Sequence, residues 1–248
     1  MVINWPLIVV LFCISIPGVF IAMTRVVHSL LPQNTEEIKT RASRLVIFQT
    51  LFMVLAMSFT GAILSSRTGL GDPLLIALLQ GSDVLNIFLS NLFPIFVYAI
   101  ICFIIFCFLY YGVVRSILDD QSLEVMTRLR AALKIDGCIL YGGIAEEVIA
   151  RWGFMNLVAF FALLFTKHMS LSVIAASIFI SGLMFAIGQI PVYIAAGCTP
   201  TRRLIYSLTA LSLCQSIVFG VVFWQYGLIS AVIAHILFHI FWAGYDRV

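Results

Sequence analysis

Seven apolar stretches, each long enough to cross a lipid bilayer as a helix, dominate this sequence of 248 residues. A membrane-spanning helix needs about 20 consecutive apolar residues. The expected spans cover residues 6–23, 45–64, 86–114, 137–165, 171–196, 204–224 and 228–244. The pattern predicts an all-α fold, a polytopic transmembrane helical bundle of about seven spans in a single domain, 1–248. The segment 69–80 is expected to form a short amphipathic or interfacial helix.

The composition excludes several classes of protein. Hydrophobic residues make up 62% of the chain and charged residues only 10%, against about 45–50% and 25% in soluble domains. A soluble enzyme and a disordered chain are therefore excluded. A net charge of +3 is too small for the clustered basic surface that nucleic-acid binding requires. The expected partner is the lipid bilayer, and the sequence leaves the oligomeric state open.

The distribution of basic residues predicts the orientation in the membrane. Eleven of the fourteen Lys and Arg residues fall on one side if the connection 25–44 is cytosolic. Cytosolic loops carry an excess of Lys and Arg, so we expect the N-terminus outside and the C-terminus in the cytosol. The connection 115–136 mixes acidic and basic residues, and its pattern favours a solvated loop or surface helix over a functional site.

Two adjacent carboxylates and one arginine stand inside the fourth apolar stretch. They are Glu146, Glu147 and Arg151. An ionised group near the bilayer centre costs about 2.5–3.5 kcal/mol on insertion scales and is functional by default. Glu147 and Arg151 are four residues apart on one helix face, so we expect them to pair. Glu146 is rotated by about 100° from Glu147, and it needs another environment: a wet cavity, a proton partner or a metal.

Two histidines in the last apolar stretch are candidate partners for Glu146. His235 and His239 are four residues apart on one face of the expected helix. At a rise of about 1.5 Å per residue, both lie at a depth similar to that of Glu146, nearer the cytosolic side. Gln189, in the fifth stretch, is expected at the same depth. We therefore predict that these four side chains converge on one site.

These motifs carry a resemblance to a known family. The run EEVIAR ends at Arg151, and the run HILFH covers residues 235–239. They resemble the E-E-x-x-x-R and H-x-x-x-N/D motifs of the CPBP intramembrane proteases, a family that includes the CAAX prenyl endopeptidases and the bacterial Abi proteins. The segment 67–73, RTGLGDP, resembles a stretch that precedes the core in bacterial members. The resemblance implies a catalytic core at about 137–244 in a protein of the bacterial inner membrane.

The resemblance also implies a role for each residue of the site. Glu146 would be the general base that activates water, and Glu147 with Arg151 would organise the site. His235 would support the tetrahedral intermediate. The implied activity is hydrolysis of a peptide bond in a membrane-anchored peptide or protein, possibly of the CAAX type.

One position departs from the family pattern. The family's second motif is F-x-x-x-H, whereas residues 185–189 read FAIGQ. Gln189 can orient water, but it cannot exchange a proton near pH 7. A positioned proton-transfer group is typically worth about 10²–10⁴ in rate. His239 stands where the family has Asn or Asp, and it offers a titratable imidazole in compensation.

Three alternatives remain open from the sequence. A metal version of the protease would bind zinc through Glu146, His235 and His239, although the chain lacks the H-E-x-x-H spacing; we favour a glutamate mechanism with no cofactor. A catalytically impaired relative would act as a membrane scaffold or binding protein, which Gln189 favours. A small transporter would use the same groups as a proton relay, but no inverted repeat is visible.

Overall fold

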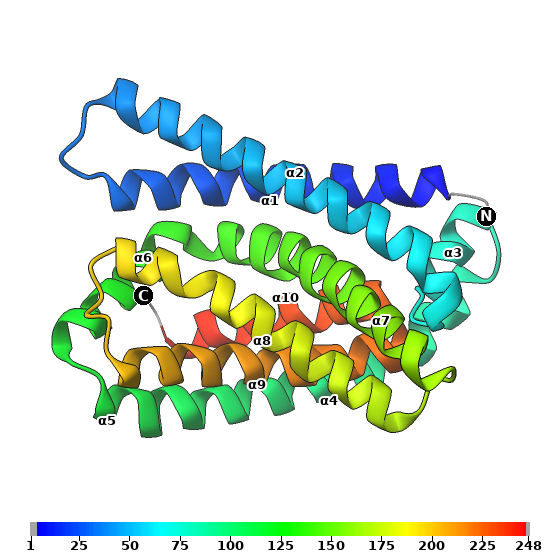
Figure 1. The fold of residues 1–248 in the computed structure, drawn as a ribbon. Helices are drawn as coiled ribbons and strands as arrows, with labels where there is room; N and C mark the ends of the chain where they lie inside the picture. Colours follow the sequence, from blue (N-terminus) through cyan, green and yellow to red (C-terminus); the bar gives the residue numbers. More distant parts are fainter. Residues whose placement is uncertain (1–3, 247–248) are drawn as a thin grey trace.

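The computed structural model describes residues 4–246, and this part of the chain is all-helical (Figure 1). Seven helical segments are long and apolar enough to span a membrane, which confirms the predicted bundle. They are Trp5–Leu30, Glu36–Thr68, Val84–Ile117, Asp120–Thr166, Leu171–Ala195, Arg202–Tyr226 and Leu228–Tyr245.

Five spans are single helices, and the third and fourth are composite. The single helices are α1 (Trp5–Leu30), α2 (Glu36–Thr68), α8 (Leu171–Ala195), α9 (Arg202–Tyr226) and α10 (Leu228–Tyr245). The third span joins α4 (Val84–Cys107), the π-helix η1 (Phe108–Val114) and α5 (Arg115–Ile117). The fourth joins α6 (Asp120–Gly137), the π-helices η2 (Cys138–Ala145) and η3 (Val148–Met155), and α7 (Asn156–Thr166). The expected short helix is α3 (Pro73–Gln80).

The connection 115–136 is packed rather than loosely solvated. It is helical over α5 and most of α6, and Val125, Met126 and Leu129 of α6 are buried. Asp119 starts α6 by accepting hydrogen bonds from the Ser122 backbone N–H and hydroxyl, both at 2.9 Å. These bonds hold the pKa of Asp119 below its usual value. The expectation of a surface segment was therefore incomplete, because one face of α6 packs against the bundle.

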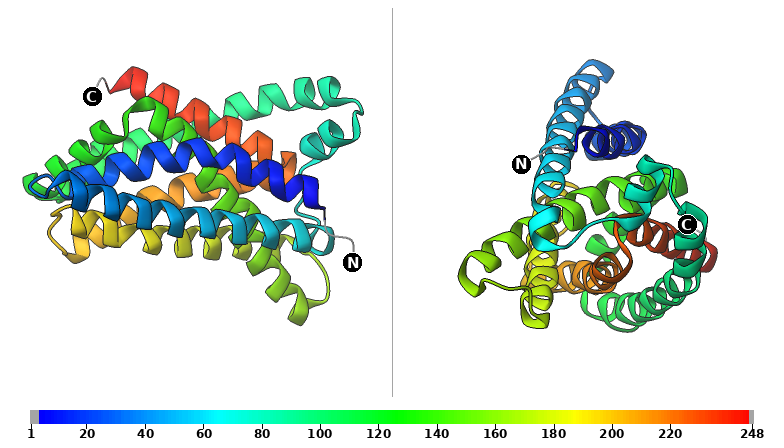
Figure 2. Two further views of the ribbon diagram at one scale, coloured as in Figure 1. Left: turned by 90° about the horizontal axis from the view of Figure 1, so that it is seen from above. Right: turned by 90° about the vertical axis from the view of Figure 1, so that its right-hand side faces the viewer.

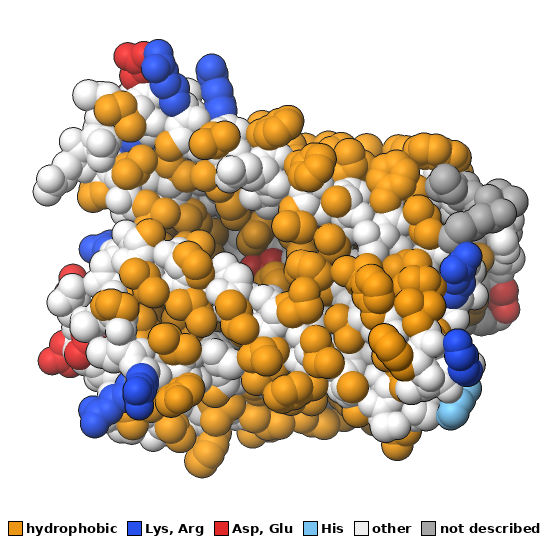
Figure 3. All heavy atoms as spheres, in the orientation of Figure 1, with side chains coloured by type: hydrophobic (Ala, Val, Ile, Leu, Met, Phe, Trp, Pro, Cys, Tyr) orange, Lys and Arg blue, Asp and Glu red, His pale blue; other side chains and the backbone are white. Residues whose placement is uncertain are grey.

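The surface has an apolar middle and two charged ends. Figure 3 shows hydrophobic side chains over the middle of one face and charged side chains at both ends. Large apolar side chains such as Phe48, Phe93 and Phe165 are exposed, as expected for residues that face lipid. The connections α1–α2, α5–α6 and α8–α9 lie at the end of the bundle where α10 ends, opposite the end where α1 begins (Figure 1). The basic connections therefore share one end of the bundle.

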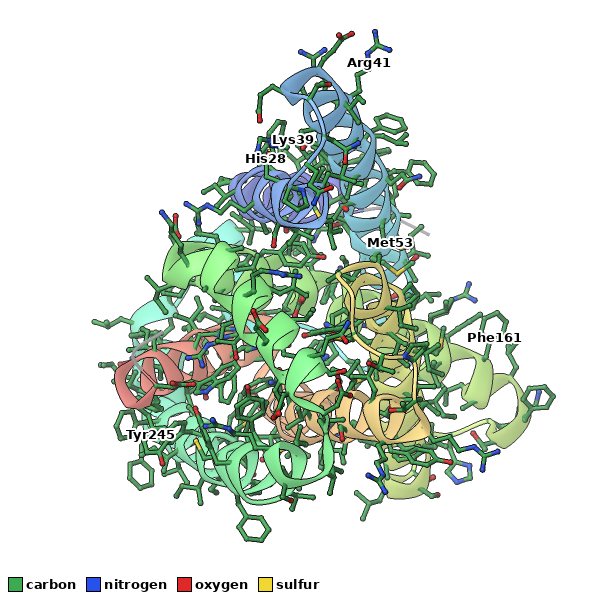
Figure 4. All side chains as sticks on the ribbon, turned by 90° about the vertical axis from the view of Figure 1, so that its left-hand side faces the viewer. His28, Lys39, Arg41, Met53, Phe161 and Tyr245 are labelled. Atoms are coloured by element: carbon green, nitrogen blue, oxygen red, sulfur yellow. The ribbon has the colours of Figure 1, made fainter. Side chains whose placement is uncertain are left out.

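The fourth span is the central element of the bundle. Its η2 part packs against α1 and α10, and its η3 part packs against α2 and α8. The α1–α2 hairpin, which carries His28, Lys39 and Arg41 at one end, lies to one side of the other helices (Figures 2 and 4). Gly142 and Gly143 allow the close approach of α10: a Cβ at Gly142 would lie 2.6 Å from His239 Nε2, and one at Gly143 would lie 2.5 Å from Ile236 Cγ1.

The segment 67–73 ties the ends of four helices together. Asn156 accepts a hydrogen bond from the Thr68 hydroxyl at 2.5 Å and donates one to the Leu70 carbonyl at 3.1 Å. Asp72 is buried, and its two carboxylate oxygens accept from the backbone N–H groups of Leu75 and Ile229. One carboxylate thus caps the N-termini of both α3 and α10. Because α10 carries His235 and His239, this segment fixes one end of the helix that bears them.

We expect Asp72→Ala to destabilise the protein more than Asp83→Ala. An N-cap carboxylate contributes about 1 kcal/mol, so loss of two caps lowers the free energy of unfolding by about 2 kcal/mol. Asp83 precedes α4, but its side chain makes no cap hydrogen bond to that helix, which makes it the matched control. Thermal unfolding of the purified protein in detergent measures both variants. Equal shifts in Tm would contradict the double cap.

Candidate functional site

The two adjacent glutamates lie between two π-helical stretches of the fourth span. η2 ends at Ala145 and η3 begins at Val148, so Glu146 and Glu147 occupy the junction. π-Helical turns inside helices occur frequently at functional sites, and they change the angle between successive side chains. Glu147 is fully buried, whereas Glu146 is only partly buried. The two carboxylates therefore have different surroundings.

Glu147 is shared between a histidine and an arginine. Its Oε1 lies 2.8 Å from Nδ1 of His235, and its Oε2 lies 3.3 Å from Nε of Arg151. The second contact is an ion pair without hydrogen-bond alignment. The Arg151 guanidinium also donates to the Gln215 carbonyl of α9 at 3.5 Å. Three buried groups from the fourth span and α10 thus form one network.

The contact with Glu147 determines what His235 can offer. Nδ1 faces a carboxylate and acts as the donor, so Nε2 is a donor only when the ring is protonated. Nε2 has no hydrogen-bond partner within residues 4–246. The ring stacks on Phe219 at 4.4 Å and on His239 at 4.7 Å between centroids. His235 is therefore fixed in orientation with one nitrogen free.

Glu146 contacts a different set of groups. Gln189 Nε2 lies 3.5 Å from Glu146 Oε1 and donates to it, and the Ser212 hydroxyl donates to Gln189 Oε1 at 3.1 Å. The serine therefore holds the amide with its NH₂ group toward the carboxylate. Sequence reasoning missed Ser212, because a serine in an apolar helix carries no pattern that marks it as functional.

Two adjoining cavities connect the predicted site residues. The larger, of about 170 Å³, is lined by Glu146, Gln189 and His239 together with aromatic side chains such as Tyr141 and Tyr193. The smaller, of about 10 Å³, is lined by Glu146, Glu147, Arg151, Gln189 and His235, among others. It has room for about one water molecule. Figure 3 shows a hollow between the α1–α2 hairpin and the helices beneath it, with an acidic side chain in its depth.

A clamp that sequence reasoning also missed borders the larger cavity. The guanidinium of Arg130, on α6, lies 3.5 Å from the ring centroid of Trp242 and donates to Asp246 Oδ2 at 2.6 Å. The Tyr111 hydroxyl donates to the same carboxylate oxygen at 2.6 Å. Burial raises the pKa of Asp246, but the hydrogen bonds from Tyr111 and Arg130 more than offset that effect, and the pKa lies below its usual value. Asp246 is therefore ionised near neutral pH.

The geometry does not fit the zinc site considered above. Within residues 4–246, no three His, Cys, Asp or Glu side chains are grouped closely enough to hold a metal ion. Glu146, His235 and His239, the ligand set considered for zinc, are not such a group.

Comparison of the chain with known protein families gives one match. Residues 131–241 match the family described as Type II CAAX prenyl endopeptidase Rce1-like. The match runs from the last part of α6 through the rest of the fourth span, α8 and α9 to most of α10, and every predicted site residue lies within it. No curated protein and no solved structure matches the chain significantly.

We expect the two glutamates to differ sharply in their effect on stability. Glu147→Gln leaves the buried Arg151 charge without its partner, and breaking a buried ion pair costs about 3–5 kcal/mol. Glu146→Gln breaks no ion pair in the described chain and should keep a near-normal Tm. Thermal unfolding in detergent measures the Tm of both single variants. The double variant Glu147→Gln/Arg151→Met should recover part of the stability that Glu147→Gln loses. A similar loss of stability in both single variants would contradict the different roles assigned to the two glutamates.

Proposed function

Because its residues 131–241 make the chain a member of the CPBP/CAAX protease family, we propose that it is an intramembrane endopeptidase that cleaves a membrane-associated, CAAX-like protein. The single observation that carries the proposal is the position of Glu146. Its carboxylate borders both cavities, contacts Gln189 and has no basic ion-pair partner among the described residues. It is therefore available to activate water.

The proposed reaction begins with a water held beside Glu146. The carboxylate removes a proton as the water oxygen attacks the scissile carbonyl, which forms a tetrahedral intermediate. Glu146 then gives that proton to the leaving amine, and the C–N bond breaks. The amide of Gln189, held by Ser212, orients the carboxylate and the water by hydrogen bonds.

His239 faces the developing oxyanion in this proposal, and His235 joins it as a donor only when its ring is protonated. His239 lines the larger cavity, and its Nε2 has no partner within residues 4–246. His235 borders the smaller cavity and is held by Glu147. Preorganised donors at an oxyanion are typically worth about 2.7–4 kcal/mol each. Glu147 and Arg151 act as positioning residues, because they bind His235 and the backbone rather than the cavity contents.

The proposed setting is a bacterial inner membrane, with the basic end of the bundle in the cytosol. The substrate reaches the cavity from that side or laterally through the bilayer. A second candidate function rests on Gln189: a family member with a weakened proton-transfer group that binds membrane proteins as a scaffold.

We expect cleavage in cells to depend on Glu146. Wild type, Glu146→Gln and Gln189→His are expressed in a host deleted for the gene, and membrane-protein termini are quantified by mass spectrometry. New termini should appear with wild type, vanish with Glu146→Gln and increase up to about 10²-fold with Gln189→His. Glu124→Gln, which removes an exposed acid on α6, is the matched control.

The pattern of termini separates the two functions. Termini that appear only with Gln189→His would identify a silenced protease that serves as a binding protein. An unchanged set of termini with Glu146→Gln would refute the hydrolytic role of this glutamate.

We also expect His239→Asn to lower cleavage. The substitution removes the imidazole that borders the cavity, and the shorter amide reaches less far toward Glu146. A drop of about 10-fold or more in the Glu146-dependent termini is expected, in line with loss of one polar catalytic group. Full activity of His239→Asn would show that the imidazole does not compensate for Gln189.

A further inference from the structure

Four residues border both the larger and the smaller cavity. They are Glu146, Gln189, Ser212 and Gln215. Hydrogen bonds from Ser212 to Gln189 and from Gln189 to Glu146 join the first three. Gln215 lies outside that chain of hydrogen bonds, yet it borders the same boundary between a water-sized space and a larger one. Its position there calls for an explanation of its own.

The spacing of residues on α9 indicates which way Gln215 points. The α9 residues that line the larger cavity are Leu208, Leu211, Ser212 and Gln215. They stand at positions i, i+3, i+4 and i+7, which is the spacing of one helix face. Gln215 therefore lies on the face of α9 that is turned toward the cavity, about one helical turn from Ser212.

The backbone of Gln215 is anchored, whereas its side chain is free. Its backbone carbonyl accepts a hydrogen bond from the Arg151 guanidinium at 3.5 Å, and its side-chain amide makes no hydrogen bond within residues 4–246. Arg151 is in turn paired with Glu147. The buried network thus fixes the helix at Gln215 and leaves an amide with two N–H donors beside the cavities. A polar group in an apolar helix is costly unless it finds a partner, so a bound molecule is the expected partner.

Hydrolysis of a peptide bond at this site needs a donor that keeps its proton at neutral pH. Nδ1 of His235 faces Glu147, so the other nitrogen of the neutral ring carries a lone pair and cannot donate. The NH₂ group of Gln189 is directed at Glu146. An amide does not titrate near neutrality and always donates. Of the two amides that border both cavities, Gln215 is therefore the one with uncommitted donors.

We propose that Gln215 is a further catalytic residue, whose side-chain NH₂ group donates a hydrogen bond to the oxyanion of the tetrahedral intermediate. This inference rests on the proposed function. As the water oxygen bonds to the substrate carbonyl carbon, an electron pair of the C=O bond moves to the carbonyl oxygen, and Glu146 takes the proton of the water. Gln215 stabilises the negative oxygen at that stage. The pair returns when the C–N bond breaks, and the leaving amine takes the proton from Glu146.

Binding of a tetrahedral anion to the purified full chain tests this inference. The protein carries Glu146→Gln, so that the proposed hydrolysis cannot consume the probe. Two fluorescent pools of randomised apolar octapeptides are compared, one with a phosphinate in place of the central peptide bond and one with the ordinary peptide bond. The phosphinate is tetrahedral and negatively charged, as the intermediate is. We expect it to bind about 10²-fold more tightly, the lower end for analogues of a transition state.

Three further substitutions in that background identify the donor. Gln215→Met removes both N–H donors at nearly constant size, and it should lower the affinity for the phosphinate pool about 10²-fold, the effect of losing one oxyanion donor. Gln215→Glu keeps the length and the polarity but replaces the NH₂ group with an oxygen, so it should also lose the preference. Gln225→Met is the matched control: Gln225 lies on the same helix and pairs with Tyr98 outside both cavity linings, so the preference should persist.

Two other measurements separate catalysis from folding. Because the Gln215 side chain has no hydrogen-bond partner in the described chain, Gln215→Met should keep the Tm of its parent and its affinity for the ordinary peptide pool. In the cellular experiment, with Glu146 restored, Gln215→Met should lower the Glu146-dependent termini about 10²-fold, and Gln225→Met should leave them unchanged. A merely structural role predicts a lower Tm and an equal loss of affinity for both pools.

Several results would overturn the inference. Equal binding of the two pools, including no binding of either, would do so, as would a phosphinate preference that survives in Gln215→Met or in Gln215→Glu. Because binding is measured without turnover, these results are independent of the cellular cleavage experiment. Absence of Glu146-dependent cleavage, together with a phosphinate preference that depends on Gln215, would refute the hydrolase and retain Gln215 as an anion donor.

Discussion

The buried carboxylate of Glu147 is the interaction on which the rest of the site depends. It lies between His235 of α10 and Arg151 of the fourth span, and all three side chains are buried. Charged groups in an apolar interior are stable only when they are paired and hydrogen-bonded. The network therefore fixes the rotation of both helices relative to each other.

The adjacent glutamates illustrate how one helix can give two carboxylates different chemistry. Both lie at the junction of η2 and η3, yet one faces a basic partner and the other faces a cavity with an amide. A basic partner stabilises the charge and lowers its reactivity, whereas an environment without one leaves the carboxylate able to exchange a proton. The π-helical turns around the junction contribute to this divergence, because they alter the angle between neighbouring side chains.

The helix that carries both histidines is held at its two ends as well as in the middle. Asp72 caps its N-terminus, and Arg130 with Tyr111 binds Asp246 just after its C-terminus. Gly142 and Gly143 let it approach η2 closely. Three separate restraints thus limit sliding and rotation of α10. This rigidity suits a site in which displacements of about 1 Å change rates strongly.

The sequence alone determined the spans and the candidate residues. A bilayer demands about 20 apolar residues per helix, so the seven spans could be predicted. Charges inside such a stretch are too costly to be accidental. The candidate residues therefore stood out as six polar groups: Glu146, Glu147, Arg151, Gln189, His235 and His239. The pairing of Glu147 with Arg151 also followed from their four-residue spacing. Only the tertiary structure decided the other partners of these groups. Ser212 beside Gln189, Arg130 at the cavity and Asp72 at two helix ends had no distinguishing pattern, and the segment 115–136 gave no sign that α6 packs against the site. These contacts join residues that are far apart in the chain, and the packing of helices, together with the π-turns that rotate their side chains, decides which of them meet.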